Sequence, residues 1–301
     1  MRHPLAAAIP PAPEGKYLVA VSGGRDSMAL LHWLIESGCR QLVVCHLDHG
    51  LRDTSASDAE FVAAHAHLLR LPVITARVEI AAQEEAAREA RYHFFASAAK
   101  QHDCTQIILA HHADDQVETF LFNLLRGGPS AMKPSSTRTV DGIALTLLRP
   151  VLGVWREEID AYIAQHRVPF REDESNAETR FTRNRLRHES IPALSAAMGR
   201  DVRRAIWRAA EILSAEDEFI AAQPALANPP AELEVATLRA LPLALQRRLV
   251  HAWLTSRRVA SVGFDEVESV VSLLTSRVAK VNLPGNLSAR RRAKRIFLGS
   301  Q

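Results

Sequence analysis

Cysteine is scarce in this chain of 301 residues. The three cysteines, Cys39, Cys45 and Cys104, form no CxxC pair. An even disulfide framework and a paired-thiolate metal motif are therefore absent. We expect three buried thiols in a protein of a reducing compartment.

Long hydrophobic runs are also absent. No run approaches the roughly 18 apolar residues that a membrane helix needs. The first 16 residues are interrupted by Pro10, Pro11 and Pro13, which is unlike the apolar centre of a secretory signal. We therefore expect a cytoplasmic protein without a membrane partner. Hydrophobic residues make up 47% and charged residues 24%, as in ordinary globular chains with a real core.

Lysine is rare, because only 5 of the 37 basic residues are lysines and the rest are arginines. Arginine contacts phosphates and stacks on bases, so this bias favours nucleic-acid binding, although a GC-rich genome produces the same bias. Eight arginines lie in residues 180–208, and five basic residues without an acid lie in residues 281–301. The sequence predicts salt-dependent nucleic-acid binding there, with solvated helix faces as the alternative.

Short apolar runs alternate with helical patterns in the first half of the chain. Expected strands cover residues 17–22, 41–47, 73–78 and 106–110, and helices cover 28–35, 57–69, 83–100 and 113–125. This alternation predicts a Rossmann-like parallel sheet with helices on both faces.

The pattern changes after Pro150. We expect a helix over 156–165, an irregular stretch over 168–187, a long helix over 191–222 interrupted at Gly199, helices over 242–257 and 264–274, and short strands over 279–283 and 293–298. The predicted domains are residues 1–215, with a linker helix, and a small α+β domain at 216–301.

The stretch Ser22-Gly23-Gly24-Arg25-Asp26-Ser27 joins the first expected strand to a helix. Neither GxxxxGK[ST] nor GxGxxG occurs in the chain, which excludes these two nucleotide-binding loops. Free N–H groups at a helix N-terminus bind anions, and glycines allow close approach of a phosphate. The stretch therefore predicts a phosphate-binding loop, with a capped tight turn as the alternative.

Two polar stretches, HLDHGLR at 46–52 and AHHADDQVET at 110–119, follow the second and fourth expected strands. The carboxyl ends of parallel strands meet at one edge of the sheet, where ligands bind. The polar side chains gathered there would be His46, Asp48, His111, His112, Asp114, Asp115 and Glu118. Several interpretations stay open: a Mg²⁺ site at Asp48, Asp114 and Asp115, a zinc site at the histidines, an ammonium pocket at Asp115 and Glu118, or carboxylates that cap a helix.

SGGRDS resembles the PP-loop of the N-type ATP pyrophosphatases. Together with HLDHGLR, AHHADDQVET, RPVL at 149–152, DESN at 173–176 and FTRNRLRH at 181–188, it resembles the tRNA(Ile)-lysidine synthetase family. The resemblance covers about residues 17–200 in the family's order. One departure is the loop 126–132, which is compressed.

The resemblance implies an adenine-nucleotide alpha-hydrolase-like fold that uses ATP and Mg²⁺. ATP would adenylate the wobble cytidine of tRNA(Ile) with a CAU anticodon, and L-lysine would then displace AMP. A homodimer, a PP-loop tRNA thiolase and a non-catalytic nucleotide-binding module stay open as alternatives.

Individual roles follow from the same resemblance. The expected ATP-binding residues are Ser22, Gly23, Gly24, Arg25, Asp26, Ser27 and His46. The expected catalytic residues are Asp26, Asp48, Asp115, Glu118 and Arg126. The expected metal ligands are Asp48 and Asp114, and the expected tRNA-binding residues are Arg183, Asn184 and Arg187.

Overall fold

The computed structural model describes residues 3–48, 50, 55–78, 84–128, 130–172 and 182–300. The chain divides into two compact units, Met1–Glu211 and Ile212–Gln301. The domain boundary expected at residue 215 stays a prediction. Among the described residues, no helix combines the length and apolar content that crossing a membrane requires.

A six-stranded sheet with the order β3-β2-β1-β4-β6-β5 forms the centre of the first unit. Its strands are β1 (Lys16–Ala20), β2 (Gln41–Asp48), β3 (Val73–Arg77), β4 (Gln106–Ile108), β5 (Ser135–Val140) and β6 (Ile143–Leu148). The first four strands and β6 pair in parallel. The predicted Rossmann-like parallel sheet is therefore confirmed.

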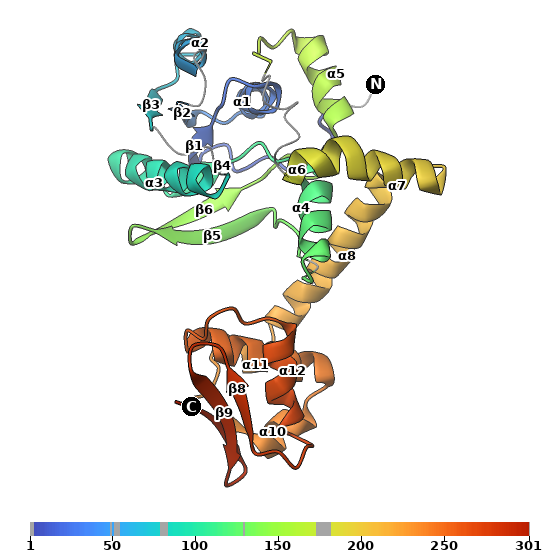
Figure 1. Ribbon diagram of the computed structural model, residues 1–301. Coiled ribbons are helices and arrows are strands. Elements are labelled where there is room, and N and C mark those ends of the chain that lie inside the picture. Colours follow the sequence, from blue (N-terminus) through green and yellow to red (C-terminus); the bar gives the residue numbers. More distant parts are fainter. Residues whose placement is uncertain are drawn as a thin grey trace. The chain divides into compact units, whose positions relative to one another are not determined.

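Strand residues alternate between two apolar layers, as the two-residue period of a strand requires. Val19, Val44 and Ile108 pack with α1 (Arg25–Glu36), α2 (Ser55–Leu68) and α5 (Arg156–His166). Their neighbours Leu18, Val43 and Ile107 pack with α3 (Glu84–His102). Figure 1 shows α1 and α2 on one side of the sheet and α3 on the other. Both faces are covered, as expected.

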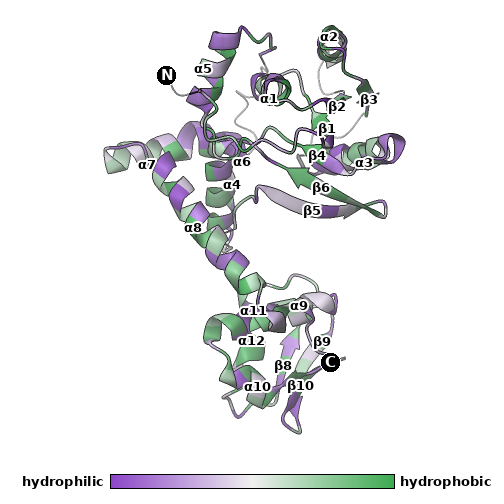
Figure 2. Ribbon diagram, turned by 180° about the vertical axis from the view of Figure 1, so that it is seen from behind, coloured by the Kyte–Doolittle hydropathy of each residue, from purple (hydrophilic) through white to green (hydrophobic). Residues whose placement is uncertain are grey.

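The hairpin of β5 and β6 was not predicted. β5 pairs antiparallel with β6 and forms one edge of the sheet. Its sequence, SSTRTV, is polar and carries only a weak strand signal, whereas β6 reads IALTLL. Figure 2 shows this difference, with β5 pale to purple and β6 largely green. The strand partner, rather than local hydrophobicity, makes β5 extended.

Helices dominate the rest of the first unit. They are α4 (Ala113–Leu125), α6 (Thr182–Arg185), a π-helical turn η2 (Leu186–Ser190), α7 (Ile191–Met198) and α8 (Arg203–Ala221), which continues into the second unit. The expected interruption at Gly199 is confirmed, because Gly199 ends α7 with a left-handed φ of 63°. The stretch expected to be irregular is helical from Thr182 onward, where the structure describes it.

The second unit packs helices on a four-stranded sheet with the order β7-β10-β9-β8. Its elements are α9 (Pro224–Ala227), β7 (Leu233–Glu234), α10 (Val235–Ala240), α11 (Leu243–Ser256), α12 (Phe264–Ser272), β8 (Lys280–Leu283), β9 (Leu287–Arg292) and β10 (Arg295–Ser300). Trp253, Val270 and Ile296 lie in its core. The strand β9 was missed because LSARRR lacks an apolar alternation that continues through the strand.

Candidate active site

The loop between β1 and α1 is held by its own serines. The Ser27 hydroxyl donates to the Gly24 carbonyl at 2.9 Å and accepts from the Ser22 amide at 3.1 Å. The Gly24 amide donates to the Ser22 hydroxyl at 3.3 Å. These bonds fix the turn while α1 begins at Arg25 with its N-terminal amides at the loop. Such an arrangement suits an anion.

Gly23 has a φ of +88°, which side chains rarely adopt. A Cβ atom there would lie 3.2 Å from Val62 of α2. The loop is also bonded to a distant segment of the chain, because the Arg171 amide donates to the Gly23 carbonyl at 3.0 Å. Gly23 therefore has both a conformational and a steric reason to be glycine.

A pocket of about 530 Å³ opens above this loop. It lies where β1 and β4 end, between the two halves of the sheet, at the position where open α/β sheets bind ligands. Five of the predicted ATP-binding residues line it: Ser22, Gly24, Arg25, Asp26 and Ser27. Arg91, Arg156 and Arg171 line it as well and supply positive charge suited to phosphates.

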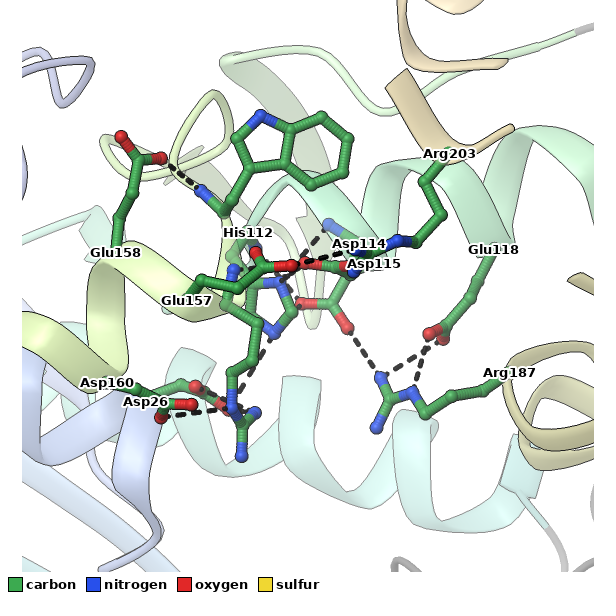
Figure 3. A network of polar contacts seen from close by, with 12 residues as sticks. Asp26, His112, Asp114, Asp115, Glu118, Glu157, Glu158, Asp160, Arg187 and Arg203 are labelled. Carbon is green, nitrogen blue, oxygen red and sulfur yellow. Dashed lines mark hydrogen bonds and ion pairs between the residues drawn. The ribbon is translucent and has the colours of Figure 1, made fainter. Parts of the chain in front are cut away.

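Asp26 and Glu172 are the carboxylates that line this pocket. Arg156 at the start of α5 donates from one guanidinium nitrogen to both Asp26 oxygens, at 2.9 and 3.0 Å (Figure 3). Burial raises the pKa of Asp26, and His112 and Arg156 oppose that shift. Asp26 thus joins the phosphate loop to the polar network at the start of α4.

His112 is the buried centre of that network. Its Nε2 atom lies 3.5 Å from Asp115 and 3.8 Å from Asp26, and its backbone amide donates to Asp115 at 3.0 Å. Burial acts to lower its pKa, but Asp115, Asp114 and Asp26 outweigh burial and raise the pKa of His112 to about 9. The three carboxylates around His112 therefore favour its protonated form.

Asp114 is fully engaged by cations and amides. Arg203 of α8 donates to one of its oxygens at 2.8 Å, and the Arg156 amide donates to the other at 3.1 Å. Burial raises its pKa, but these bonds, together with His112, lower it well below the usual range. Figure 3 shows Asp114 facing Arg203, and Asp115 and Glu118 facing Arg187.

Glu118 lies one turn along α4 and is buried. Arg187 of η2 donates to it at 2.6 and 3.2 Å and to Asp115 at 3.2 Å. Burial raises the pKa of Glu118, and Arg187 opposes this shift. A second pocket of about 670 Å³ opens here, lined by His112, Asp114, Glu118, Arg156, Arg187 and Arg203 together with residues of η2 and α7. Arg156 borders both pockets.

The structure does not bring the two predicted metal ligands together. Asp48 is buried at the end of β2, where it accepts from the Gly50 amide at 2.8 Å and faces Arg77 at 3.8 Å. It lines neither pocket. Asp114 contacts Arg203, Arg156 and His112 instead. The three-residue sets able to hold a metal ion, in the part of the chain that the structure describes, include neither aspartate.

His46 and Arg126 also lie apart from the pockets. The His46 Nδ1 atom contacts the Val21 carbonyl at 2.8 Å, because alternation along β2 turns Cys45 and Leu47, not His46, toward the first pocket. Arg126 caps the far end of α4, eleven residues or about 16 Å of helix from Asp115, and stacks over Phe122.

The predicted tRNA-binding residues are on neighbouring turns. Arg183 and Asn184 belong to α6, and Arg187 to η2. Arg187 is bound to Glu118 and Asp115, so its guanidinium is occupied within the chain. The resemblance segment 173–176 lies outside the described residues.

No ATP-binding, catalytic or tRNA-binding role was predicted for His112, Arg156 or Arg203. His112 stands in the motif at 110–119, and Arg156 follows the RPVL segment by four residues, so the signal for them was present. Arg203 lies in a helix far along the chain, and only the fold places it beside Asp114.

Comparison with known families agrees with this division of the chain. Residues 2–194 match the PP-loop domain family, and residues 233–297 match the TilS substrate binding domain family. A U34-tRNA thiolase from Methanococcus maripaludis shares the fold, with a TM-score of 0.54 over 68% of this chain and 74% of its own, at 11% identity.

Curated relatives are named tRNA(Ile)-lysidine synthase. The one from Thermosynechococcus vestitus is 34% identical, covering 87% of this chain and 79% of the relative. That from Gloeobacter violaceus is 36% identical, covering 92% and 88%. That from Thermus thermophilus is 38% identical over 95% of this chain, which spans 57% of that relative. The chain belongs to the tRNA(Ile)-lysidine synthase family.

Proposed function

We propose that this protein ligates L-lysine to C2 of the wobble cytidine of tRNA(Ile) with a CAU anticodon, at the expense of ATP. The cytidine O2 attacks the α-phosphorus of ATP and pyrophosphate leaves. The lysine ε-amine then attacks C2, loses a proton and expels AMP. A cytoplasmic location is part of this proposal, because its substrates are tRNA and ATP.

The observation that carries the proposal is the pair of adjoining pockets. The first has a glycine-rich loop, a helix N-terminus and several arginines, which suit a triphosphate. The second has Asp114, Glu118 and Arg187 beside the same Arg156. A carboxylate suits an ammonium group of lysine, so lysine would take over the pairing of Glu118 with Arg187 and leave that guanidinium for the lysine carboxylate. The adjoining positions would let an adenylated base meet lysine without release.

The proposed roles of the acidic residues follow from their surroundings. Asp26 faces the phosphate pocket and would share Mg²⁺ with ATP oxygens, since Mg²⁺ takes one or two carboxylates plus phosphates. Bound Mg²⁺ would neutralise the leaving pyrophosphate. Glu118 lines the second pocket and is the candidate for holding lysine, whereas Asp115 lines neither pocket and would act through its contacts with Arg187 and His112. Asp48 at the end of β2 and Arg126 at the end of α4 line neither pocket and take no part in this assignment.

Sulfur transfer is the less favoured chemistry. Cys45 is the cysteine that lines the first pocket, and burial raises its pKa to about 12. A thiol with that pKa supplies almost no thiolate at neutral pH. The match to the TilS substrate binding domain also favours lysine over sulfur.

The test is transfer of labelled lysine to tRNA(Ile) and methionine tRNA transcripts that both carry CAU, in Mg-ATP. We expect lysine on the isoleucine tRNA alone. Asp26→Asn should lower the rate by about 100-fold or more, through lost positioning of charge at the phosphates. Asp160→Asn is the matched control, because Asp160 also binds Arg25 and Arg156 but lines neither pocket. Equal rates in the two variants would contradict the role of Asp26.

A further inference from the structure

A second polar cluster lies outside both pockets, on another face of the first unit. It consists of His3, Glu36 at the end of α1, and His166 at the end of α5, all exposed. One ligand atom from each lies within 4.8 Å of the other two. The His3 Nε2 atom is 3.6 Å from Glu36. This is the one such His, Cys, Asp or Glu set found over the described ranges.

One buried side chain orients all three groups. The Tyr162 hydroxyl donates to Glu36 at 2.8 Å. The His166 ring stacks on the Tyr162 ring with centroids 4.3 Å apart, and the His3 ring is tilted toward it at 5.8 Å. Buried partners of this kind fix metal ligands in productive orientations.

The electrostatic setting also favours a cation. Glu36 and His166 are the last residues of α1 and α5, where the carbonyl ends of both helices concentrate negative potential. A carboxylate at the C-terminal end of a helix is unfavourable unless a positive charge neutralises it. A divalent ion between these two helix ends would neutralise both.

We propose that His3, Glu36 and His166 bind one divalent transition-metal ion of the zinc type. Two imidazoles and one carboxylate are a ligand set typical of Zn²⁺, with a fourth position left for water. Imidazole ligands favour Zn²⁺, Ni²⁺ or Cu²⁺ over Mg²⁺. Coordination through the His3 Nε2 atom needs the ring proton on Nδ1. The long 3.2 Å hydrogen bond that Nδ1 accepts from the Leu5 amide is then lost.

The ion would hold the C-terminal ends of α1 and α5 together, at the opposite ends of these helices from the phosphate pocket. α1 and α5 pack together, and both begin at the phosphate pocket, where Asp26 binds Arg156 and Arg25 binds Asp160. Their C-terminal ends meet at the proposed metal. A twelve-residue helix is about 18 Å long, so the ion stabilises the pocket without touching substrate.

The test titrates chelator-stripped full-length protein with Zn²⁺ against a chromophoric competitor, in excess Mg²⁺ to fill oxygen-ligand sites. Glu36→Gln and His166→Ala each remove one ligand, and Tyr162→Phe removes only the orienting hydroxyl. The matched control is His93→Ala, because His93 is another exposed histidine that contacts a carboxylate, Asp141, at 2.8 Å. Metal-free unfolding curves verify that each variant folds.

We expect one Zn²⁺ per chain in the wild type and in His93→Ala. The affinity should fall at least about 10-fold in Glu36→Gln and His166→Ala, and by a smaller factor in Tyr162→Phe. Saturating Zn²⁺ should raise the melting temperature of the wild type but not of His166→Ala. Equal Zn²⁺ affinity in the wild type and His166→Ala, or no binding by the wild type at tenfold molar excess, overturns the proposal.

Discussion

Two single residues determine most of the local chemistry at the candidate site. Gly23 permits the turn that exposes backbone amides to a phosphate, and His112 permits three carboxylates to share one small volume. Both positions stand in motifs visible in the sequence. Their physical roles differ, because Gly23 acts through conformation and contact, whereas His112 acts through charge.

Gly23→Ala should damage both stability and activity. Its φ of +88° costs about 1 kcal/mol for alanine, and the contact with Val62 adds strain in the loop itself. Gly127→Ala is the control, since Gly127 has a φ of +89° with nothing within 4 Å. Denaturant unfolding should show a loss in both variants, whereas pyrophosphate release should fall only in Gly23→Ala. A normal rate in Gly23→Ala would contradict the loop's role.

The raised pKa of His112 predicts that the folding stability depends on pH. Its pKa is about 9 in the folded chain and about 6.5 when unfolded. The protonated form is therefore favoured by folding, and its stabilisation is complete below pH 6.5 and lost as pH rises through 9. The difference amounts to roughly 3 kcal/mol. The stability advantage of the wild type over His112→Asn should shrink across this range in unfolding measurements. A constant advantage would mean a neutral His112.

Among elements, the contact between α4 and the turn η2 joins the acidic cluster to the arginine-rich segment. Sequence predicted α4 and its carboxylates, but assigned Arg187 to tRNA. In the structure Arg187 balances the buried Glu118, and its tRNA contact stays a prediction. The resemblance of DDQVET to the family motif therefore identified the carboxylates. Their partner Arg187 lies about seventy residues away in the chain, and the fold brings it to them.

Arg187→Met should destabilise the protein by about 3 kcal/mol, because it leaves Glu118 buried without its cation. The double variant with Glu118→Gln should recover most of this loss, because Glu118 then carries no charge and Asp115 keeps its contact with His112. Arg185→Met is the control, because Arg185 is exposed and its guanidinium contacts the neighbouring Thr182 rather than a carboxylate. Denaturant unfolding measures all three. If the double variant is as unstable as Arg187→Met alone, the pairing explanation fails.

At the scale of the whole molecule, some basic side chains of the second unit bind within that unit, and others are exposed to solvent. Arg291 donates to the carbonyls of Leu273 and Ser276, within its own unit. The side chains of Arg292 and Lys294 are exposed at the turn between β9 and β10. They are suited to tRNA phosphates.

Arg292→Ala with Lys294→Ala should weaken tRNA binding and reduce the salt dependence of its affinity by about one unit of slope per lost phosphate contact. ATP binding should not change, because these residues belong to the second unit. Lys100→Ala, on α3, is a control at another exposed lysine. Filter binding at several salt concentrations provides the slopes. An unchanged slope would exclude these two residues from the tRNA interface.

The sequence by itself determined the family, the alternation of strands and helices, and the loop Ser22–Ser27, because these depend on local periodicity and on residues adjacent in the chain. Tertiary structure decided which residues share a pocket. The pairing of β2 within the sheet placed Cys45 at the first pocket and His46 against the Val21 carbonyl. The fold brought Arg156 and Arg203 to carboxylates 42 residues or more distant in the chain. It also gathered His3, Glu36 and His166. Contacts between distant segments depend on packing geometry, which local sequence patterns do not encode.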